Sequence, residues 1–411
     1  MSRRVFLTGL AMLAARPARA ELPSVRIGLL HPVTGPLAEP GHACRLAAQI
    51  AADDINAAGG IKSMNGARLE LVLGDTQTRQ EVAKAEAERL AGAGIAILVG
   101  CFNSGDSAAV VPVAQRRRLP FLIDVSAADL VTASVARAVK DGREKVQYVY
   151  RNFPTSTLFG QRAVQYFDEI FKQAGLGSPR VVLMHGNDLF GHGQARGFLA
   201  AHKAARPSWD VVEVIAWPEP PLDVAAEVTR AKAARPDVIA PITRPVSARV
   251  LLPEIARQRV ELLGIVGPGS PGLYEAGQLS VLKGQLEHVM TSVPWPNFKK
   301  PQARRLAEEF VRRSGGPTLD TNAGYSYDAI LIVADVLERA RSREPEAVIE
   351  ALRTTRLADT VMVAAGPVIF NDTGDNPNAA PAMVQILGQR PWVVWPKALA
   401  ERGLTFPRPR R

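Results

Sequence analysis

Cysteine and histidine are scarce in this chain, and their scarcity excludes several kinds of chemistry. Only two cysteines occur among 411 residues, Cys44 and Cys101, and neither has a second cysteine at a metal-ligand spacing. The six histidines never pair at i and i+4, the spacing of a helix-borne zinc site. A G-x-S-x-G elbow, a Walker A loop, a dinucleotide glycine fingerprint and an H-E-x-x-H motif are also missing from the sequence. We therefore expect neither an enzyme nor a protein that depends on a metal or cofactor.

The chain also lacks a long apolar run, although a short one follows its basic start. Arg3 and Arg4 lead into Val5-Phe6-Leu7 and an apolar stretch that ends near residue 15, too short to span a membrane. Small residues at 18 and 20 follow. This pattern is typical of a twin-arginine export signal over residues 1–20, cleaved after Ala20, and it favours a periplasmic protein. A buried N-terminal helix is the weaker interpretation, because the arginine flanks and the lack of acids do not suit one.

The positive charge gives no sign of a nucleic-acid partner. The whole chain carries a formal charge of +10, and removal of the leader, which has four arginines and no acid, leaves +6. The remaining basic residues are dispersed, including a helical run at 116–118 and a basic tail over 401–411, without interleaved aromatic residues. We interpret them as solvated faces and expect no nucleic-acid binding.

The two cysteines leave one question open. Export to an oxidising compartment permits a disulfide without requiring one. Cys44 falls in the first turn of the first predicted helix, and Cys101 follows a strand that could neighbour it. Both a Cys44–Cys101 bridge and two free thiols are compatible with this placement.

Apolar strands alternate with amphipathic helices along most of the chain, and the alternation occurs twice. Strands that are apolar at consecutive positions and alternate with helices predict parallel sheets covered on both faces. After residue 284 the pattern changes to one strand over 288–293, helices over 302–313 and 325–341, and an antiparallel ribbon of 361–370 with 383–387. The first series of strands covers 25–30, 69–73, 95–99 and 121–125, and the second covers 181–184, 211–215, 238–242 and 263–266. The sequence therefore predicts an α/β protein with two similar lobes.

The segment 99–105 combines a strand end, a tight turn and a helix start. Gly100, Asn103 and Ser104 separate the apolar strand from a helical pattern that runs to residue 118. The free backbone N–H groups of a helix N-terminus bind carboxylates and similar acceptors. Polar loops at the carboxyl ends of strands, between two lobes without catalytic motifs, predict a ligand-binding cleft.

Several motifs, in this order, resemble the type I periplasmic binding proteins of the leucine/isoleucine/valine-binding family. They are Ile27-Gly28-Leu29-Leu30 with Thr34-Gly35-Pro36, the run at 57–61, the loop at 100–104, Leu189-Phe190-Gly191-His192-Gly193, and Arg235-Pro236-Asp237-Val238. The resemblance implies two doubly wound parallel-sheet lobes joined by a three-segment hinge. It divides the chain into lobe 1 over 21–150 and 285–345, lobe 2 over 151–284 and 346–400, and the tail over 401–411. It also implies a monomer that serves the membrane permease of an ABC importer and binds a small-molecule ligand.

The resemblance further suggests which residues touch the ligand. The position of Ser104 holds the ligand carboxylate in the family, with Ser126 and Ala127 beside it, and Phe190 replaces a stacking tyrosine. The family's amine-binding acid falls within 267–270, where this chain has no carboxylate, and Ala128 and Pro40 replace two further ligand contacts. The predicted ligand-binding residues are Phe102, Asn103, Ser104, Ser126, Ala127, Phe190, Arg244, Gly269, Ser270 and Tyr325.

The missing carboxylate within 267–270 indicates which ligands the protein can bind. A ligand ammonium buried without a carboxylate partner costs several kcal/mol, so we expect a small carboxylate or amide without an α-amino group, an aromatic acid among them. Arg244 follows the strand at 238–242 and either grips a second anionic group or points to solvent. A true branched-chain amino-acid binder, an exported sensor that signals to a membrane partner, and a secreted hydrolase are the alternatives.

Overall fold

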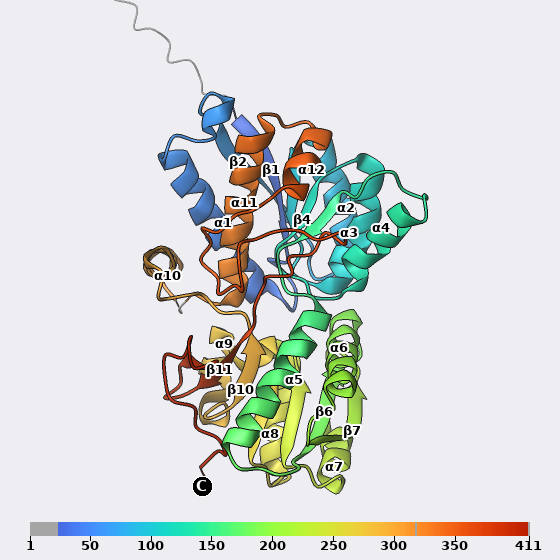
Figure 1. Cartoon of the computed structure of the whole chain (residues 1–411), viewed down its shortest axis with the longest axis vertical. Helices are drawn as coiled ribbons and strands as arrows, with labels where there is room; N and C mark the ends of the chain where they lie inside the picture. Colours follow the sequence, from blue (N-terminus) through green and yellow to red (C-terminus); the bar gives the residue numbers. More distant parts are fainter. Residues whose placement is uncertain (1–23, 317–318, 410–411) are drawn as a thin grey trace, which may run out of the picture.

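The computed structural model describes residues 24–316 and 319–409. The predicted export signal and its cleavage site after Ala20 lie outside the described residues. Two α/β lobes stand one above the other in Figure 1, and the chain runs from the upper lobe to the lower lobe, back to the upper lobe and finally to the lower lobe again. The predicted α/β fold with two doubly wound lobes is confirmed.

Lobe 1 is built on a five-stranded parallel sheet in the order β2-β1-β3-β4-β5. Helices α1 (Ala38–Ala57) and α11 (Thr321–Ala340) cover one face, and α2 (Gln80–Gly92), α3 (Ser104–Arg117) and α4 (Leu130–Lys140) cover the other. Alternate residues of each strand enter the two separate cores, which is why these strands are apolar at consecutive positions. The strands are β1 (Ser24–His31), β2 (Arg68–Asp75), β3 (Ile97–Gly100), β4 (Phe121–Ile123) and β5 (Val149–Arg151).

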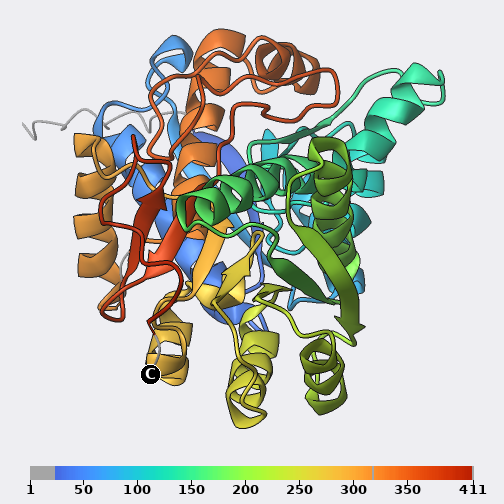
Figure 2. The ribbon, with the colours of Figure 1, turned by 60° about the horizontal axis from the view of Figure 1, so that its bottom comes forward.

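Lobe 2 has a seven-stranded sheet in the order β12-β11-β10-β9-β8-β6-β7, in which β11 pairs antiparallel with both of its neighbours. Helices α5 (Ser156–Gln173) and α6 (Leu189–Ala205) pack on one face of this sheet. Helices α7 (Ala225–Ala233), α8 (Pro245–Arg257) and α9 (Ala276–Leu282) pack on the other face. Figure 2 shows this lobe from below. The strands are β6 (Arg180–Gly186), β7 (Asp210–Trp217), β8 (Val238–Ile242), β9 (Gly264–Gly267), β10 (Met290–Val293), β11 (Ala382–Ile386) and β12 (Pro391–Trp395).

The chain passes between the sheets three times: between β5 and α5, between β10 and α10 (Pro301–Ser314), and ahead of β11. The predicted lobe boundaries need two corrections. Strand β10 pairs with β9, so 285–293 belongs to lobe 2 rather than lobe 1. Helix α12 (Pro345–Arg353) buries its apolar face in the α11 side of lobe 1, which moves 346–379 there from lobe 2. The tail joins lobe 2, because Phe406 packs on Phe171 with ring centroids 5.7 Å apart.

The prediction that 361–370 pairs with 383–387 in an antiparallel ribbon is wrong. Residues 361–370 form only isolated bridges, and the partner of β11 is β12. Two features explain this. The carboxylate of Asp328 accepts the backbone N–H groups of Val361 and Met362 at 2.8 and 3.2 Å, which ties the segment to α11. Pro367 has no N–H group to donate to a strand ladder.

Cys44 and Cys101 are both free and buried, so the structure decides against the bridge. Cys44 faces the core shared by α1 and α11, whereas Cys101 packs in the core on the opposite face of the same sheet. The sheet separates the two sulfur atoms. Burial raises the pKa of both thiols well above the ordinary value, which keeps them protonated and unreactive.

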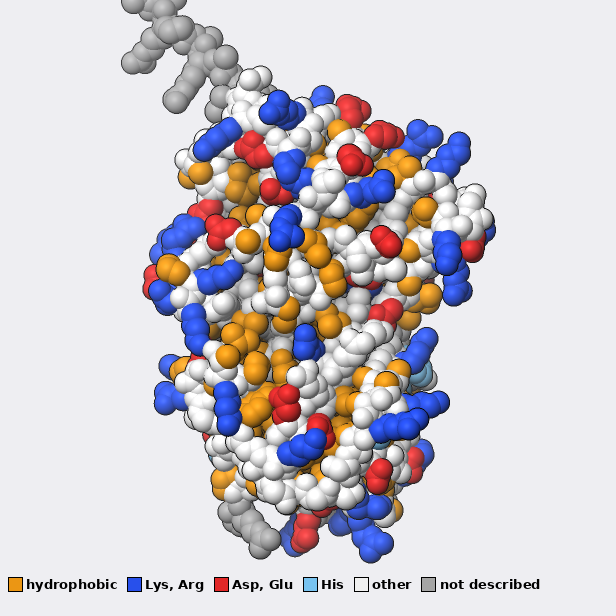
Figure 3. Space-filling model, viewed as in Figure 1, with side chains coloured by type: hydrophobic (Ala, Val, Ile, Leu, Met, Phe, Trp, Pro, Cys, Tyr) orange, Lys and Arg blue, Asp and Glu red, His pale blue; other side chains and the backbone are white. Residues whose placement is uncertain are grey.

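Basic and acidic side chains are interspersed over the face seen in Figure 3. Arg116 and Arg117, which begin the basic run in α3, both pair with Glu88, and the Arg117 Nε to Glu88 Oε2 distance is 2.7 Å. Within 24–316 and 319–409, no helix combines the length and apolarity that crossing a membrane requires.

Candidate functional site

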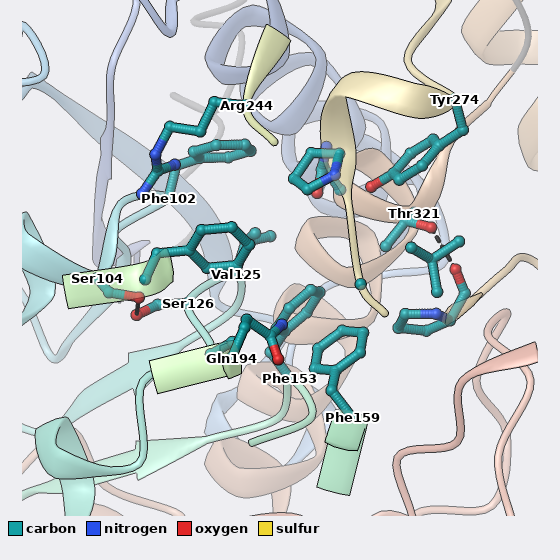
Figure 4. A pocket seen from close by; sticks show the side chains of 17 residues that line it. Phe102, Ser104, Val125, Ser126, Phe153, Phe159, Gln194, Arg244, Tyr274 and Thr321 are labelled. Carbon is teal, nitrogen blue, oxygen red and sulfur yellow. Dashed lines mark hydrogen bonds between the residues drawn. The ribbon is translucent and has the colours of Figure 1, made fainter. Parts of the chain in front are cut away.

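A cavity lies between the two lobes, with about 30 Å³ of space for the centres of water-sized molecules inside an envelope of about 430 Å³ that includes open solvent. Both lobes line it, and Figure 4 shows polar groups at its left end and aromatic rings around its middle. Its lining residues are Phe102, Ser104, Val125, Ser126, Ala127, Phe153, Phe159, Phe190, Gln194, Arg244, Gly269, Pro271, Tyr274, Val293, Pro294, Thr321 and Asn322.

The turn from β3 into α3 forms the polar end of the lobe 1 wall. At Gly100, where φ is +139°, a Cβ atom would lie 2.1 Å from the carbonyl oxygen of Leu30, so only glycine fits this turn. Asn103 then caps α3, its Oδ1 accepting the N–H of Gly105 at 3.4 Å. Because Asn103 is the N-cap, Ser104 is the first residue of α3, and it lines the cavity.

Ser104 and Ser126 lie together at this polar end. The Ser126 hydroxyl donates to Ser104 Oγ at 3.3 Å, and the N–H of Ala128 donates to the same oxygen at 3.3 Å. Both serines are buried. Two hydroxyls beside a helix N-terminus make a site for an anionic or strongly accepting group, because the partial positive charge of the helix end adds to their hydrogen bonds.

Arg244 faces the cleft rather than solvent, with 9% of its surface exposed. Its Nε and Nη2 donate to Asp188 Oδ2 at 3.0 and 2.8 Å, and Nη2 also donates to Asn103 Oδ1 at 3.0 Å. The guanidinium lies 4.7 Å from the ring centre of Phe190, a cation–π distance. Arg244 therefore connects lobe 2 to the cap of α3 in lobe 1.

Gln194, in the second turn of α6, is a site residue that the sequence analysis missed. It is 1% exposed, and neither Oε1 nor Nε2 has a hydrogen-bond partner among the described residues. Its amide lies against the cavity beside Phe159 in Figure 4. A buried amide without partners costs free energy unless something else satisfies it, so the ligand is the natural partner.

Aromatic side chains form the walls between the polar groups. Phe153 follows β5 and Phe159 lies in α5, and their ring centroids are 5.7 Å apart. Behind them Tyr325 makes an edge contact with Phe153 at 4.9 Å. These rings pack as a rigid group, which suits a flat apolar ligand body.

A second interlobe contact lies at the far side of the cavity. Asn322 at the start of α11 donates from Nδ2 to Glu275 Oε1 of lobe 2 at 3.0 Å. Burial, together with Asp320 and Glu39, raises the pKa of Glu275 well above its ordinary value. Next to it the Thr321 hydroxyl donates to the carbonyl of Pro294. The lobes are thus joined at both ends of the cavity, by Arg244 and by Glu275.

Seven of the ten predicted residues line the cavity. Three do not. Asn103 caps α3 and holds Arg244, and Tyr325 supports Phe153 from the core. Ser270 is wholly buried in lobe 2, where its hydroxyl accepts the N–H of Thr243 at 2.8 Å, so it faces the protein interior.

The cavity lining, which is fully within the described residues, contains no carboxylate. Its one charged side chain is Arg244, and its other polar groups are hydroxyls and amides. Gly269 occupies the position where the resemblance expects an acid. Among the described residues no group of three metal-ligating side chains was found either.

Comparisons with known proteins agree with this architecture. A family model described as periplasmic binding protein matches residues 24–390. The chain belongs to this family. The leucine-, isoleucine-, valine-, threonine- and alanine-binding protein of Pseudomonas aeruginosa is 24% identical over 356 residues, covering 86% of this chain and 88% of the relative. Leu/Ile/Val-binding protein homolog 8 of Brucella abortus is 23% identical over 399 residues, with 94% of both chains covered.

Solved structures share the fold of this periplasmic binding protein. The branched-chain amino acid transporter substrate binding protein of Streptococcus pneumoniae, in complex with isoleucine, superposes with a TM-score of 0.76 at 19% identity, covering 90% of this chain and 97% of that one. A solute binding protein of an ABC transporter from R. palustris, in complex with benzoate, gives a TM-score of 0.74 at 16% identity, covering 90% and 95%. At these identities the likeness concerns the fold.

Proposed function

We propose that this periplasmic binding protein is the receptor of an ABC importer and that it binds a small carboxylate without an α-amino group, with an aromatic acid as the preferred class. One observation carries the proposal: the cavity lining has hydroxyls, a helix N-terminus and an arginine, but no carboxylate to pair with an ammonium. A buried, unpaired ammonium is strongly unfavourable. Relatives that bear the names of amino-acid binders support the transport role, and they leave the ligand of this cavity open.

The carboxylate end fits the Ser104–Ser126 pair, and the apolar body fits the phenylalanine walls. Four phenylalanines line the cavity, and ring-on-ring contacts favour a flat aromatic ligand. That a protein of this fold has been solved with benzoate is consistent with this choice. A charge at a helix N-terminus contributes at most about 2 kcal/mol, whereas micromolar affinity needs about 8 kcal/mol, so the second lobe must supply the rest.

In this role residues 1–20 direct export and are removed after Ala20, and the ligand stabilises the arrangement in which the lobes touch. The permease then distinguishes liganded from empty receptor by this shift of population. Arg244 serves both as a cavity wall and as a contact to Asn103 of the other lobe, so ligand binding and lobe contact depend on the same side chain.

The test is a thermal-shift screen followed by calorimetry on the mature protein. Benzoate and related small acids should raise Tm and bind, whereas leucine and valine should not. Stabilisation by leucine or valine without any response to acids would refute the proposed ligand class and return the protein to the branched-chain amino-acid binders.

A further inference from the structure

Gln194 is the one cavity side chain whose polar atoms are both buried and without a partner in the described part of the chain. Four other polar side chains of the lining each have a hydrogen-bond partner among the described residues. Ser104 and Ser126 bond each other, Arg244 holds Asp188, and Asn322 holds Glu275. An amide in this situation needs one donor and one acceptor from whatever fills the cavity.

Gly269 makes room for this amide. A Cβ atom at Gly269 would lie 2.9 Å from Gln194 Nε2 and 3.0 Å from Phe159 Cδ1, and its φ of +91° also disfavours any larger residue. A side chain at 269 and the observed position of Gln194 therefore exclude one another. The neutral amide of Gln194 has the space that an acidic side chain at 269 would need.

We propose that Gln194 determines ligand specificity by recognising a hydroxyl group on the carboxylate ligand. A hydroxyl donates to Oε1 and accepts from Nε2, so a single group satisfies both amide atoms. A plain carboxylate cannot donate, and an ammonium cannot accept from Nε2. The inference rests on the proposed function, and it narrows the ligand to a hydroxylated acid, of which a hydroxybenzoate is the aromatic example.

The position of Gln194 supports a contact with a part of the ligand other than its carboxylate. Ser104 and Ser126 belong to lobe 1, whereas Gln194 projects from α6 of lobe 2. The two polar groups appear as separate clusters in Figure 4, with Gln194 beside Phe159. A site that hydrogen-bonds a substrate hydroxyl rejects the analogue lacking it, because the buried polar group then stays unsatisfied.

The experiment compares benzoate with 2-, 3- and 4-hydroxybenzoate by calorimetry on the wild type and on Gln194→Leu. In the wild type at least one hydroxybenzoate should bind about tenfold more tightly than benzoate, and the leucine variant should lose that preference while keeping benzoate. Gln161→Leu is the matched control: Gln161 is exposed on α5 outside the cavity, and its variant should retain the preference.

The outcomes separate this inference from the proposed function. Two results would show that Gln194 does not recognise a hydroxyl group: acids bind without any preference for a hydroxybenzoate, or the preference remains in Gln194→Leu. In both cases the proposed function as an acid receptor is unaffected. If neither benzoate nor any hydroxybenzoate binds the wild type, the aromatic-acid function and this inference both fall. Should Gln194→Leu fail to fold by near-UV circular dichroism, Gln194→Met gives the same test with a flexible apolar chain.

Discussion

The two walls of the cavity present their polar groups by different means. In lobe 1 the polar end comes from one strand-to-helix turn and a neighbouring loop, through Ser104, Ser126 and the N-terminus of α3. In lobe 2 the polar groups come from separate elements, with Gln194 on α6, Arg244 ahead of α8 and Gly269 after β9. The first wall uses backbone geometry, and the second uses side chains that adjacent helices hold in place.

Under the proposed function, this difference gives each wall a separate task. The N–H groups of a helix N-terminus and nearby hydroxyls donate hydrogen bonds to many kinds of acceptor. The first wall therefore selects ligands that carry an anionic or strongly accepting group. A buried amide and a fixed guanidinium have directional requirements, so the second wall selects among members of that class. Changes in the second wall should therefore alter which ligand binds, and changes in the first should weaken all ligands together.

The largest effect is expected from placing an acid in the second wall. Gly269→Glu should lower the affinity for benzoate about a hundredfold, because the new carboxylate repels an anion and the backbone φ of +91° disfavours a side chain. Calorimetry measures the affinity, and Gly403→Glu, at an exposed glycine with open space around it, is the control. Retained benzoate affinity in Gly269→Glu would mean that the ligand does not approach this part of the wall.

The next effect concerns the arginine that spans both walls. Arg244→Ala should weaken an anionic ligand about tenfold, since it removes a cation from the cavity and the link to Asn103. Arg257→Ala is the control: Arg257 lies in α8, its side chain is 67% exposed, pairs with Glu254 of the same helix and is outside the cavity. Equal affinities of Arg244→Ala and wild type would restrict Arg244 to holding Asp188.

A smaller effect separates two serines. Ser126→Ala should weaken every acid about fivefold, because one hydroxyl hydrogen bond contributes about 1 kcal/mol. Ser270→Ala should leave affinity unchanged and lower Tm, since that hydroxyl is bonded to Thr243 within lobe 2. The prediction fails if Ser270→Ala changes affinity more than Ser126→Ala does.

A carboxyl in the helix behind the first wall should affect folding stability rather than ligand binding. Burial raises the pKa of Asp106, in the first turn of α3, from 3.8 to about 6. The folded protein thus holds this proton more tightly than the unfolded chain, and the stability it contributes is lost as the pH rises from about 4 to about 6. Asp106→Asn should remove that pH-dependent change, which amounts to about 3 kcal/mol in the free energy of unfolding for a pKa raised from 3.8 to about 6.

Chemical denaturation between pH 4 and pH 7 measures this slope. Asp372→Asn, at an exposed aspartate, should leave the slope unchanged. An identical slope in Asp106→Asn and wild type would show that this carboxyl does not resist ionisation in the folded protein.

The parallel strands and the β3–α3 turn were predictable because their signals are local. Consecutive apolar residues mark buried strands, and Asn103 followed by Ser104 marks a capped helix start. The seven predicted residues that line the cavity sit at strand ends or in the family motifs, where topology brings side chains together. Asp188 caps α6, where its carboxylate accepts the N–H of Gly191 at 2.7 Å.

The wrong assignments share a cause. Whether 346–379 packs on one lobe or the other depends on contacts between α12 and α11 and on Asp328, which lie far apart in sequence from the hinge crossings. Helix α5 carries Phe159 into the cavity, yet its amphipathic pattern was not recognised between 156 and 173. Gln194 looks like an ordinary helix residue, and only its burial and its unpartnered amide single it out.

The sequence by itself predicted the fold class, the polar turn between β3 and α3 and, through the family resemblance, the lack of an acid within 267–270, because hydrophobic periodicity, caps and residue identity are local properties. The tertiary structure alone decided that Arg244 turns inward onto Asp188, that Ser270 faces Thr243, and that Cys44 and Cys101 lie on opposite faces of a sheet. A side chain's direction is set by the neighbours that pack around it, and those neighbours come from distant parts of the chain.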